Sequence, residues 1–135
     1  MQIRLANIFV DDQERALRFY TDVLGFVKMA DIPIGEYRWL TVTAPEGLEG
    51  VELVLEPLAF EPARTYQKAL YEANIPATAF FSLEIEAEFQ RLKERGVRFR
   101  GEPQTNGPVK AVLFEDTCGN LIQLVQPLLP VGQAE

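Results

Sequence analysis

The hydrophobic pattern of the chain alternates between strand-like and helix-like periods from its first residues. Residues 3–10 are rich in Ile, Leu, Phe and Val, a composition typical of a strand. Apolar residues then recur at helical spacing up to Gly25, which favours a helix end there. Asp11 and Glu14 have the spacing of a capping box. The N-terminal part is therefore predicted to form a strand followed by a helix.

The same order of elements is predicted twice along the chain. Three short apolar or alternating segments follow the first helix, separated by turns that contain Pro, Gly and Glu. The second half again reads as a strand, a helix that ends at Gly96, and three strands. The strands predicted after the first helix lie at 26–29, 37–42 and 51–55; those of the second half lie at 77–82, 97–99, 109–114 and 121–125, with its helix beginning at Ile85.

A constant offset between the halves indicates an internal duplication. Gly25 and Gly96 are 71 positions apart, and the turn residues Gly50 and Gly119 are 69 apart. The sequence therefore predicts an α+β fold of two tandem βαβββ modules, 1–56 and 77–127, within one domain that covers 1–135. Each module is too small to bury its sheet alone. The connecting segment 57–76 contains a predicted helix at 62–74, whose role is a lid, a dimer contact or a simple connection.

Composition narrows the chemistry that the domain can carry out. The 135 residues include 13 Lys plus Arg, 20 Asp plus Glu and no His, and the net charge is −7. Without histidine, triads that use His, imidazole proton shuttles and His-ligated zinc are excluded. The acidic balance disfavours nucleic acid as a partner and favours cationic ligands.

Cysteine usage and hydropathy predict the compartment. Cys118 is the single cysteine, so an intrachain disulfide and a Cys-based zinc site are excluded. Residues 1–9 lack the continuous apolar core of a signal peptide, and no run reaches the about 18 apolar residues of a membrane span. We therefore expect a cytoplasmic protein with no membrane association.

Three stretches of the chain carry a resemblance to a known family. They read NIFVDDQERALRFYTDVLGF, FFSLEIEAEFQRLKERGVRF and VLFEDTCGNLIQLVQP. Together they resemble the vicinal oxygen chelate superfamily, which contains glyoxalase I, extradiol dioxygenases, fosfomycin resistance enzymes and bleomycin resistance proteins. This resemblance implies a glyoxalase-like domain whose curved sheets enclose a cleft.

The resemblance also implies where a metal ion would be held. Members with metal chemistry take one ligand from the first strand and one from the last strand of each module, which correspond here to Leu5, Glu52, Ala77 and Gln123. Leu5 and Ala77 have no donor atoms, and Gln123 is a weak neutral donor. We therefore expect no cofactor and no metal ligands. The alternative is a weakly held divalent ion, magnesium or manganese, on Glu52 and Gln123.

Strand alternation places a set of candidate ligand-binding residues on the cleft face. Glu52 lies on the face opposite Leu53 and Leu55, which suit packing under a helix. Glu52 is a relic, a ligand contact or a catalytic base, and the aromatic residues of the set either line a pocket or fill the space of a lost metal site. Cys118 is interpreted as a turn residue. The candidate ligand-binding residues are Asn7, Phe9, Tyr37, Trp39, Glu52, Phe81 and Gln123.

Two functions of different classes follow. The first is a metal-free protein, similar to bleomycin resistance proteins, that binds a small cationic or aromatic molecule in clefts formed by a homodimer. The second is an enzyme, a glyoxalase-like lyase, an isomerase or a dioxygenase, that uses Glu52 and Gln123 with a divalent ion. The sequence leaves open whether the protein is an enzyme, and the resemblance implies the homodimer.

Overall fold

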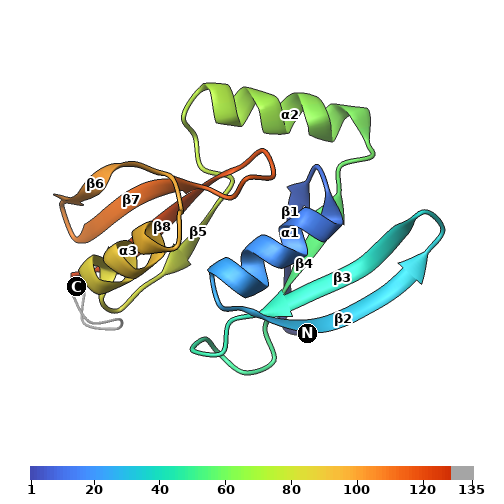
Figure 1. Ribbon diagram of the computed structural model, residues 1–135, viewed down its shortest axis with the longest axis horizontal. Helices are drawn as coiled ribbons and strands as arrows, with labels where there is room; N and C mark the ends of the chain where they lie inside the picture. Colours follow the sequence, from blue (N-terminus) through green and yellow to red (C-terminus); the bar gives the residue numbers. More distant parts are fainter. Residues whose placement is uncertain (129–135) are drawn as a thin grey trace.

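Two four-stranded sheets, one from each half of the chain, form the framework of the computed structural model, which describes residues 1–128 (Figure 1). Sheet A has the strand order β1-β4-β3-β2 and sheet B has the matching order β5-β8-β7-β6. The predicted pair of βαβββ modules is therefore confirmed. Sheet A comprises β1 (Leu5–Val10), β2 (Val27–Ile34), β3 (Tyr37–Thr43) and β4 (Glu52–Pro57); sheet B comprises β5 (Thr78–Phe81), β6 (Phe99–Asn106), β7 (Val109–Glu115) and β8 (Leu121–Pro127).

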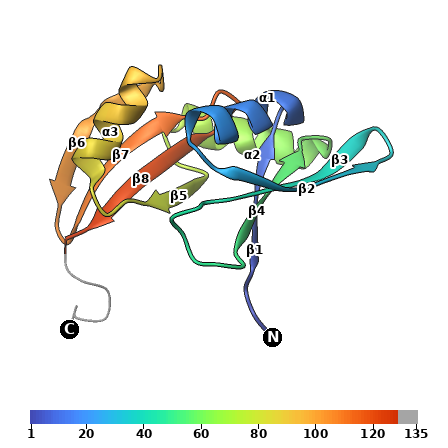
Figure 2. The ribbon, with the colours of Figure 1, turned by 60° about the horizontal axis from the view of Figure 1, so that its bottom comes forward.

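The helices cover one face of each sheet and connect the modules. Helix α1 (Gln13–Arg18) continues into the π-helical segment η1 (Phe19–Val23), and α3 (Ile85–Glu94) is its counterpart on sheet B. Helix α2 (Glu61–Glu72) lies across the top of both modules in Figure 1. Figure 2 shows α1 and α3 on the same side of the two sheets. No helix within residues 1–128 is long and apolar enough to cross a membrane.

Helix α1 begins one residue later than the predicted capping box. Asp12 is the N-cap, and its carboxylate accepts the Arg15 N–H at 3.0 Å. Asp11 instead accepts from the Arg15 guanidinium at 2.6 Å. Glu14 pairs with Arg18 and Arg38 rather than with the backbone at the helix start. The capping box predicted on Asp11 and Glu14 is therefore wrong, because Asp12 caps the helix and arginine side chains pair with both of the other carboxylates.

The edge strands β2 and β6 are longer than their hydrophobic patterns predict. The predicted strands end at Met29 and Phe99, whereas β2 reaches Ile34 and β6 reaches Asn106. An edge strand has one free side, so it tolerates proline and polar residues that a central strand excludes. Both strands also contain a shift of register against their partners, between Lys28 and Ala30 in β2 and between Arg100 and Gln104 in β6.

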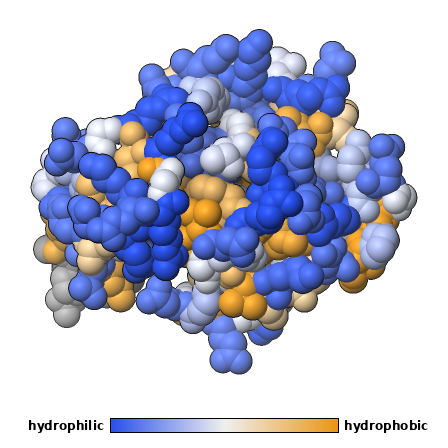
Figure 3. All heavy atoms as spheres, viewed as in Figure 1, coloured by the Kyte–Doolittle hydropathy of each residue, from blue (hydrophilic) through white to orange (hydrophobic). Residues whose placement is uncertain are grey.

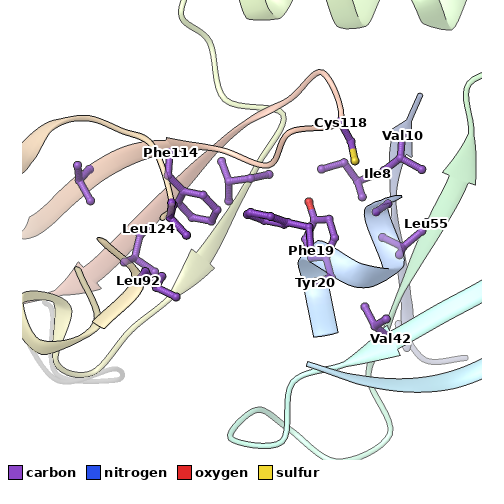
Figure 4. Close-up of a cluster of buried hydrophobic side chains, with 14 of the residues drawn as sticks. Ile8, Val10, Phe19, Tyr20, Val42, Leu55, Leu92, Phe114, Cys118 and Leu124 are labelled. Atoms are coloured by element: carbon purple, nitrogen blue, oxygen red, sulfur yellow. The ribbon is translucent and has the colours of Figure 1, made fainter. Parts of the chain in front are cut away.

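One hydrophobic core joins the modules beneath the helices. Phe19 extends from the first helix toward Phe114 of sheet B, and the Tyr20 hydroxyl points toward the turn that contains Cys118 (Figure 4). The rings of Phe19 and Phe114 lie 6.5 Å apart, centroid to centroid. Leu40 and Val42 belong to the same core, as the alternation of β3 predicts. Because the core uses the inner faces of both sheets, their outer faces are free to carry a site.

Candidate functional site

The outer face of sheet B contains a row of side chains that crosses all four strands. Arg100 of β6 pairs with Leu113 of β7, Leu113 pairs with Gln123 of β8, and Gln123 pairs with Ala79 of β5. Directly paired residues point to the same face. A guanidinium, an aliphatic side chain and an amide thus lie side by side, with neighbouring strands about 4.8 Å apart.

A bulge in β6 opens a hollow beside this row. The next paired row contains Gln104, Ala111, Val125 and Phe81, so β6 spans four positions where β7 spans two. The hollow has a volume of about 300 Å³ and is lined by 100–102 and 104 of β6, 111–113 of β7 and Gln123. Its lining joins apolar residues of β7 to polar side chains of β6 and β8, and its volume lies at the lower end of the range for ligand sites.

Arg100 is held at the edge of the hollow by residues from two other elements. Its guanidinium lies over the Tyr71 ring, 5.2 Å from the centroid. It donates to Glu115 at 3.3 Å and to Asn74, which follows α2. The Tyr71 hydroxyl donates to the second oxygen of Glu115 at 3.0 Å. The C-terminal end of α2 therefore fixes the position of a charged side chain in sheet B.

Glu52 lies on the outer face of sheet A, as the alternation of β4 predicts. It pairs with Leu5 of β1, which places the two first-module positions of the family's metal site side by side. Its carboxylate accepts from the hydroxyl of Thr41 at 2.7 Å, and Thr41 in turn accepts from the Ala30 N–H at 3.1 Å. Thr41 is fully buried, so this hydrogen bond fixes the Glu52 carboxylate on the face.

The remaining candidates of sheet A share this outer face. Asn7 pairs with Val54 and is exposed, and Phe9 pairs with Glu56 and is half-buried. In the β2–β3 hairpin, Trp39 pairs with Ile32 and Tyr37 pairs with Ile34. The two isoleucines are 55% and 59% exposed, so the hairpin presents an apolar surface to solvent. Figure 3 shows the opposite side of the molecule, that of the helices, where hydrophilic residues surround smaller patches of hydrophobic ones.

The seven predicted ligand residues thus divide between two sheets. Five lie on sheet A, while Phe81 and Gln123 lie on sheet B. The sheets do not close into a barrel within residues 1–128. The hollow of sheet B includes Gln123 but none of the sheet A candidates, and Tyr37 lines a separate recess near the start of α1. Within residues 1–128 of a single protomer, Glu52 and Gln123 therefore do not line the same pocket.

The four positions at which the family holds its metal ion, Leu5, Glu52, Ala77 and Gln123, do not supply enough donor atoms for tight metal binding. Ala79, not Ala77, lies directly beside Gln123, so the second-module position shifts by two residues along the same face. Neither alanine has a donor atom, and neither does Leu5. Residues 1–128 contain no group of three or more His, Cys, Asp or Glu side chains arranged to hold an ion. Glu52 and Gln123 are on separate sheets, and a structural or catalytic metal usually takes three protein ligands or more.

The 116–120 turn is a structural joint between the modules. Asp116 is fully buried and accepts from the Tyr20 hydroxyl at 2.8 Å and from the Cys118 N–H at 2.8 Å. Asn120 donates to the Phe9 carbonyl at 2.8 Å. Burial raises the pKa of the Cys118 thiol to about 12. A thiol with this pKa is not a nucleophile at neutral pH, which supports the interpretation of Cys118 as a turn residue.

Sequence reasoning missed Arg100, Gln104 and Leu113 as lining residues of the hollow. The segment that contains Arg100 and Gln104 has many polar residues and ends at Gly107 and Pro108, so it reads as a turn, whereas Leu113 lies in the predicted strand 109–114. One usable signal exists: Arg100, Glu102 and Gln104 alternate with period two. That period predicts a polar face on an edge strand. The bulge that turns this face into a hollow also has a signal in Gly101, a glycine within the strand, whose φ of 93° lies in the left-handed region.

Comparisons with known proteins agree with this fold. The family model described as the Glyoxalase/Bleomycin resistance protein/Dioxygenase superfamily matches residues 2–124. The uncharacterized protein YurT of Bacillus subtilis (strain 168) is 48% identical over 126 residues, which cover 93% of this chain and 99% of YurT. Two solved structures are also similar over nearly their full lengths.

The first of these structures is TnmS3, an antibiotic binding protein from Streptomyces sp. CB03234. It is 30% identical, with a TM-score of 0.74, and the match covers 94% of this chain and 96% of TnmS3. The second is a member of the glyoxalase/bleomycin resistance protein/dioxygenase superfamily from Sphaerobacter thermophilus DSM 20745. It is 28% identical, with a TM-score of 0.72, and the match covers 93% of this chain and 97% of that one.

Proposed function

The chain belongs to the glyoxalase/bleomycin resistance protein/dioxygenase superfamily, and from this premise we propose that it binds a small molecule with an aromatic body, without a metal ion. The hollow on the outer face of sheet B carries the proposal, because it combines the apolar Ala111 and Leu113 with the polar Arg100, Gln104 and Gln123. The antibiotic-binding relative TnmS3 supports the same class of function. The cationic ligand expected from the net charge of −7 stays a prediction.

The proposal includes a homodimer in which the hollow of one protomer faces sheet A of its partner. Sheet A leaves Leu5, Ile32 and Ile34 more than half exposed, and sheet B leaves Phe81 69% exposed. Exposed apolar side chains of this size on a sheet face favour association. Such a pairing would bring Trp39 and Glu52 of the partner to the hollow and complete the predicted set of ligand residues. We place this dimer in the cytoplasm, which suits the single free thiol of Cys118.

Sedimentation equilibrium tests the dimer. We expect a mass of twice 15.3 kDa for the wild type and a shift toward the monomer for the variant Ile32→Glu/Ile34→Glu. The matched control is Val51→Glu/Leu48→Glu, which adds the same charge at exposed positions outside the hairpin. A wild-type monomer at all concentrations would contradict the dimer.

Titration with an aromatic probe tests the binding function. Naphthalene-2-carboxamide should stabilise the protein against heat. Because the proposed dimer brings Trp39 of one protomer to the hollow of the other, the probe should also change the fluorescence of this single tryptophan. The substitution Leu113→Glu, which places a charge on the floor of the hollow, should remove both effects. Gln90→Glu, on the exposed side of α3, is the control. No binding by the wild type would contradict the function.

Metal addition separates this function from the alternative enzyme. A divalent-ion-assisted lyase, isomerase or dioxygenase that uses Glu52 and Gln123 requires that metal and substrate bind together. Under the binding hypothesis, Mg, Mn, Ni or Zn ions should neither co-purify at one equivalent nor raise the melting temperature. One bound equivalent that is lost on Glu52→Ala would favour the enzyme instead.

A further inference from the structure

We propose that Arg100 selects the ligand of the sheet B hollow by donating hydrogen bonds to an oxygen acceptor, a carbonyl or carboxylate, next to an aromatic ring. This inference rests on the proposed binding function and specifies its ligand chemistry. It also gives α2 a role, because the C-terminal end of that helix positions the Arg100 side chain.

Arg100 retains hydrogen-bonding capacity after its internal contacts are counted. A guanidinium has five N–H donors in a rigid plane. Within residues 1–128, the contacts to Asn74 and Glu115 use one donor on each of the two terminal nitrogens. The remaining donors include Nε–H. The side chain is 34% exposed and lines the hollow, so a ligand there lies beside the guanidinium.

The position of the guanidinium is fixed before a ligand arrives. Tyr71 supports one face of the group, and Glu115 is itself held by the Tyr71 hydroxyl. A free arginine side chain loses much rotamer entropy when it binds, and a side chain that is already held loses less. The contacts of Arg100 therefore reduce the entropy that its side chain loses when it binds a ligand.

Neighbouring side chains favour an oxygen acceptor over a cation. Gln123 and Gln104 lie on the same outer face as Arg100 and offer amide N–H donors. The Arg100 charge repels an ammonium group at this edge of the hollow. Glu115 offsets part of this charge, and Glu102 also lines the hollow, so a neutral carbonyl satisfies the donors without an opposing charge. A carboxylate satisfies the same donors, and the experiment separates the two.

Three probes with one ring system test the inference in the full-length wild type. They are naphthalene-2-carboxamide, naphthalene-2-carboxylate and 2-naphthylmethylammonium, each titrated by calorimetry. We expect the carboxamide to bind about tenfold more tightly than the ammonium probe, the effect of one hydrogen bond to a charged donor. The carboxylate result then shows whether a negative charge adds to the affinity. Equal or tighter binding of the ammonium probe would overturn the inference.

Substitutions test whether Arg100 causes the preference for the carboxamide probe over the ammonium probe. Arg100→Met should reduce the preference for the carboxamide over the ammonium probe to about twofold or less, while Arg98→Met, an exposed neighbour outside the hollow, should retain it. Tyr71→Phe removes the hydroxyl that holds Glu115 and keeps the ring, so it should reduce the preference by less. Circular dichroism checks that each variant is folded, and Arg100→Leu, which also removes the charge and the donors, serves if Arg100→Met is not.

The outcomes separate this inference from the proposed function. If none of the three probes binds the wild type, the binding function and the inference both fail. If all three bind equally and Arg100→Met binds them as the wild type does, the binding function stands and the inference fails. If Arg100→Met loses the preference but Arg98→Met loses it as well, the selection arises from overall charge, and the inference fails.

Discussion

Asp31 and Arg38 form a two-point ion pair across the β2–β3 hairpin. Nε and Nη2 of Arg38 donate to the two Asp31 oxygens at 3.0 Å and 2.8 Å. These hydrogen bonds lower the pKa of Asp31 from its ordinary value of 3.8 to about 2. A paired carboxylate with a depressed pKa stabilises the fold fully above its unfolded pKa and loses that contribution as the pH falls to its folded pKa.

Stability measurements against pH test this pair. Asp31→Asn should lower the melting temperature between pH 5 and 7, and its difference from the wild type should shrink between about pH 4 and pH 2, the window between the two pKa values. Glu46→Gln, an exposed carboxylate in the loop after β3, is the control and should show no such window. A difference that persists unchanged at pH 2 would contradict the assigned pKa.

Cys118 offers a second test at the level of one residue. Its thiol is fully buried, and burial raises the pKa to about 12. At pH 8 the native protein should react with a thiol reagent such as dithionitrobenzoate only through unfolding, whereas guanidinium chloride should release one reactive thiol per chain. Rapid stoichiometric labelling of the native protein would show that the 116–120 turn opens on its own.

Helix α2 is joined to both modules through Gln67. Its amide nitrogen lies within hydrogen-bond distance of the Phe9 carbonyl at 3.0 Å, the Cys118 carbonyl at 3.2 Å and the Asn120 side-chain oxygen at 3.1 Å. Gly119 makes room for this amide, because a Cβ there would lie 2.7 Å from the Gln67 Oε1 atom. The helix is therefore held by polar contacts, with Ala63 as its one buried residue in the described chain.

Alanine substitution at two glycines separates backbone strain from crowding. Gly119 and Gly96 have similar positive φ values of 98° and 91°, and a Cβ on Gly96 meets no atom within 4 Å. Each substitution should cost about 1 kcal/mol for the strained backbone. Gly119→Ala should cost about 1–2 kcal/mol more in the free energy of unfolding, because Gln67 must give up its hydrogen bonds.

A double variant supplies the control for that comparison. In the background of Gln67→Ala, Gly119→Ala should cost no more than Gly96→Ala, as measured by urea denaturation. Equal costs of the two glycine substitutions in the wild type would mean that the turn and α2 move apart without loss.

The sequence predicted elements well where burial decides the pattern and poorly where pairing decides it. Apolar periodicity and glycine positions predict the duplication, the inner faces of β3 and β4, and a helix at 62–74. The structure agrees with each of these predictions. The ends of β2 and β6 do not follow, because edge-strand residues pair through the backbone whatever their side chains. Arg100 was missed for the same reason, since its contacts depend on the bulge in β6 and on the C-terminal end of α2.

The modules are joined as one molecule by the core and by a buried polar contact. Tyr20 of the first module is fully buried, and its hydroxyl donates to Asp116 of the second. Asp116 also accepts from the backbone and side chain of Asn120, yet its burial raises its pKa above the ordinary value. Loss of the Tyr20 hydroxyl would leave the buried Asp116 carboxyl with fewer hydrogen-bond partners, which would lower the free energy of unfolding.

Tyr20→Phe tests how much this contact stabilises the molecule as a whole. The variant should lose about 1–3 kcal/mol of unfolding free energy, while Tyr66→Phe, at an exposed position of α2, should lose almost none. Hydrogen exchange of peptides from β3 and from β7 gives one readout for each module. Because Phe19 and Phe114 share a core, both peptides should keep a common opening free energy in the wild type and in Tyr20→Phe. Separate free energies in the wild type would mean that the modules unfold independently and that the Tyr20 contact only adds local stability.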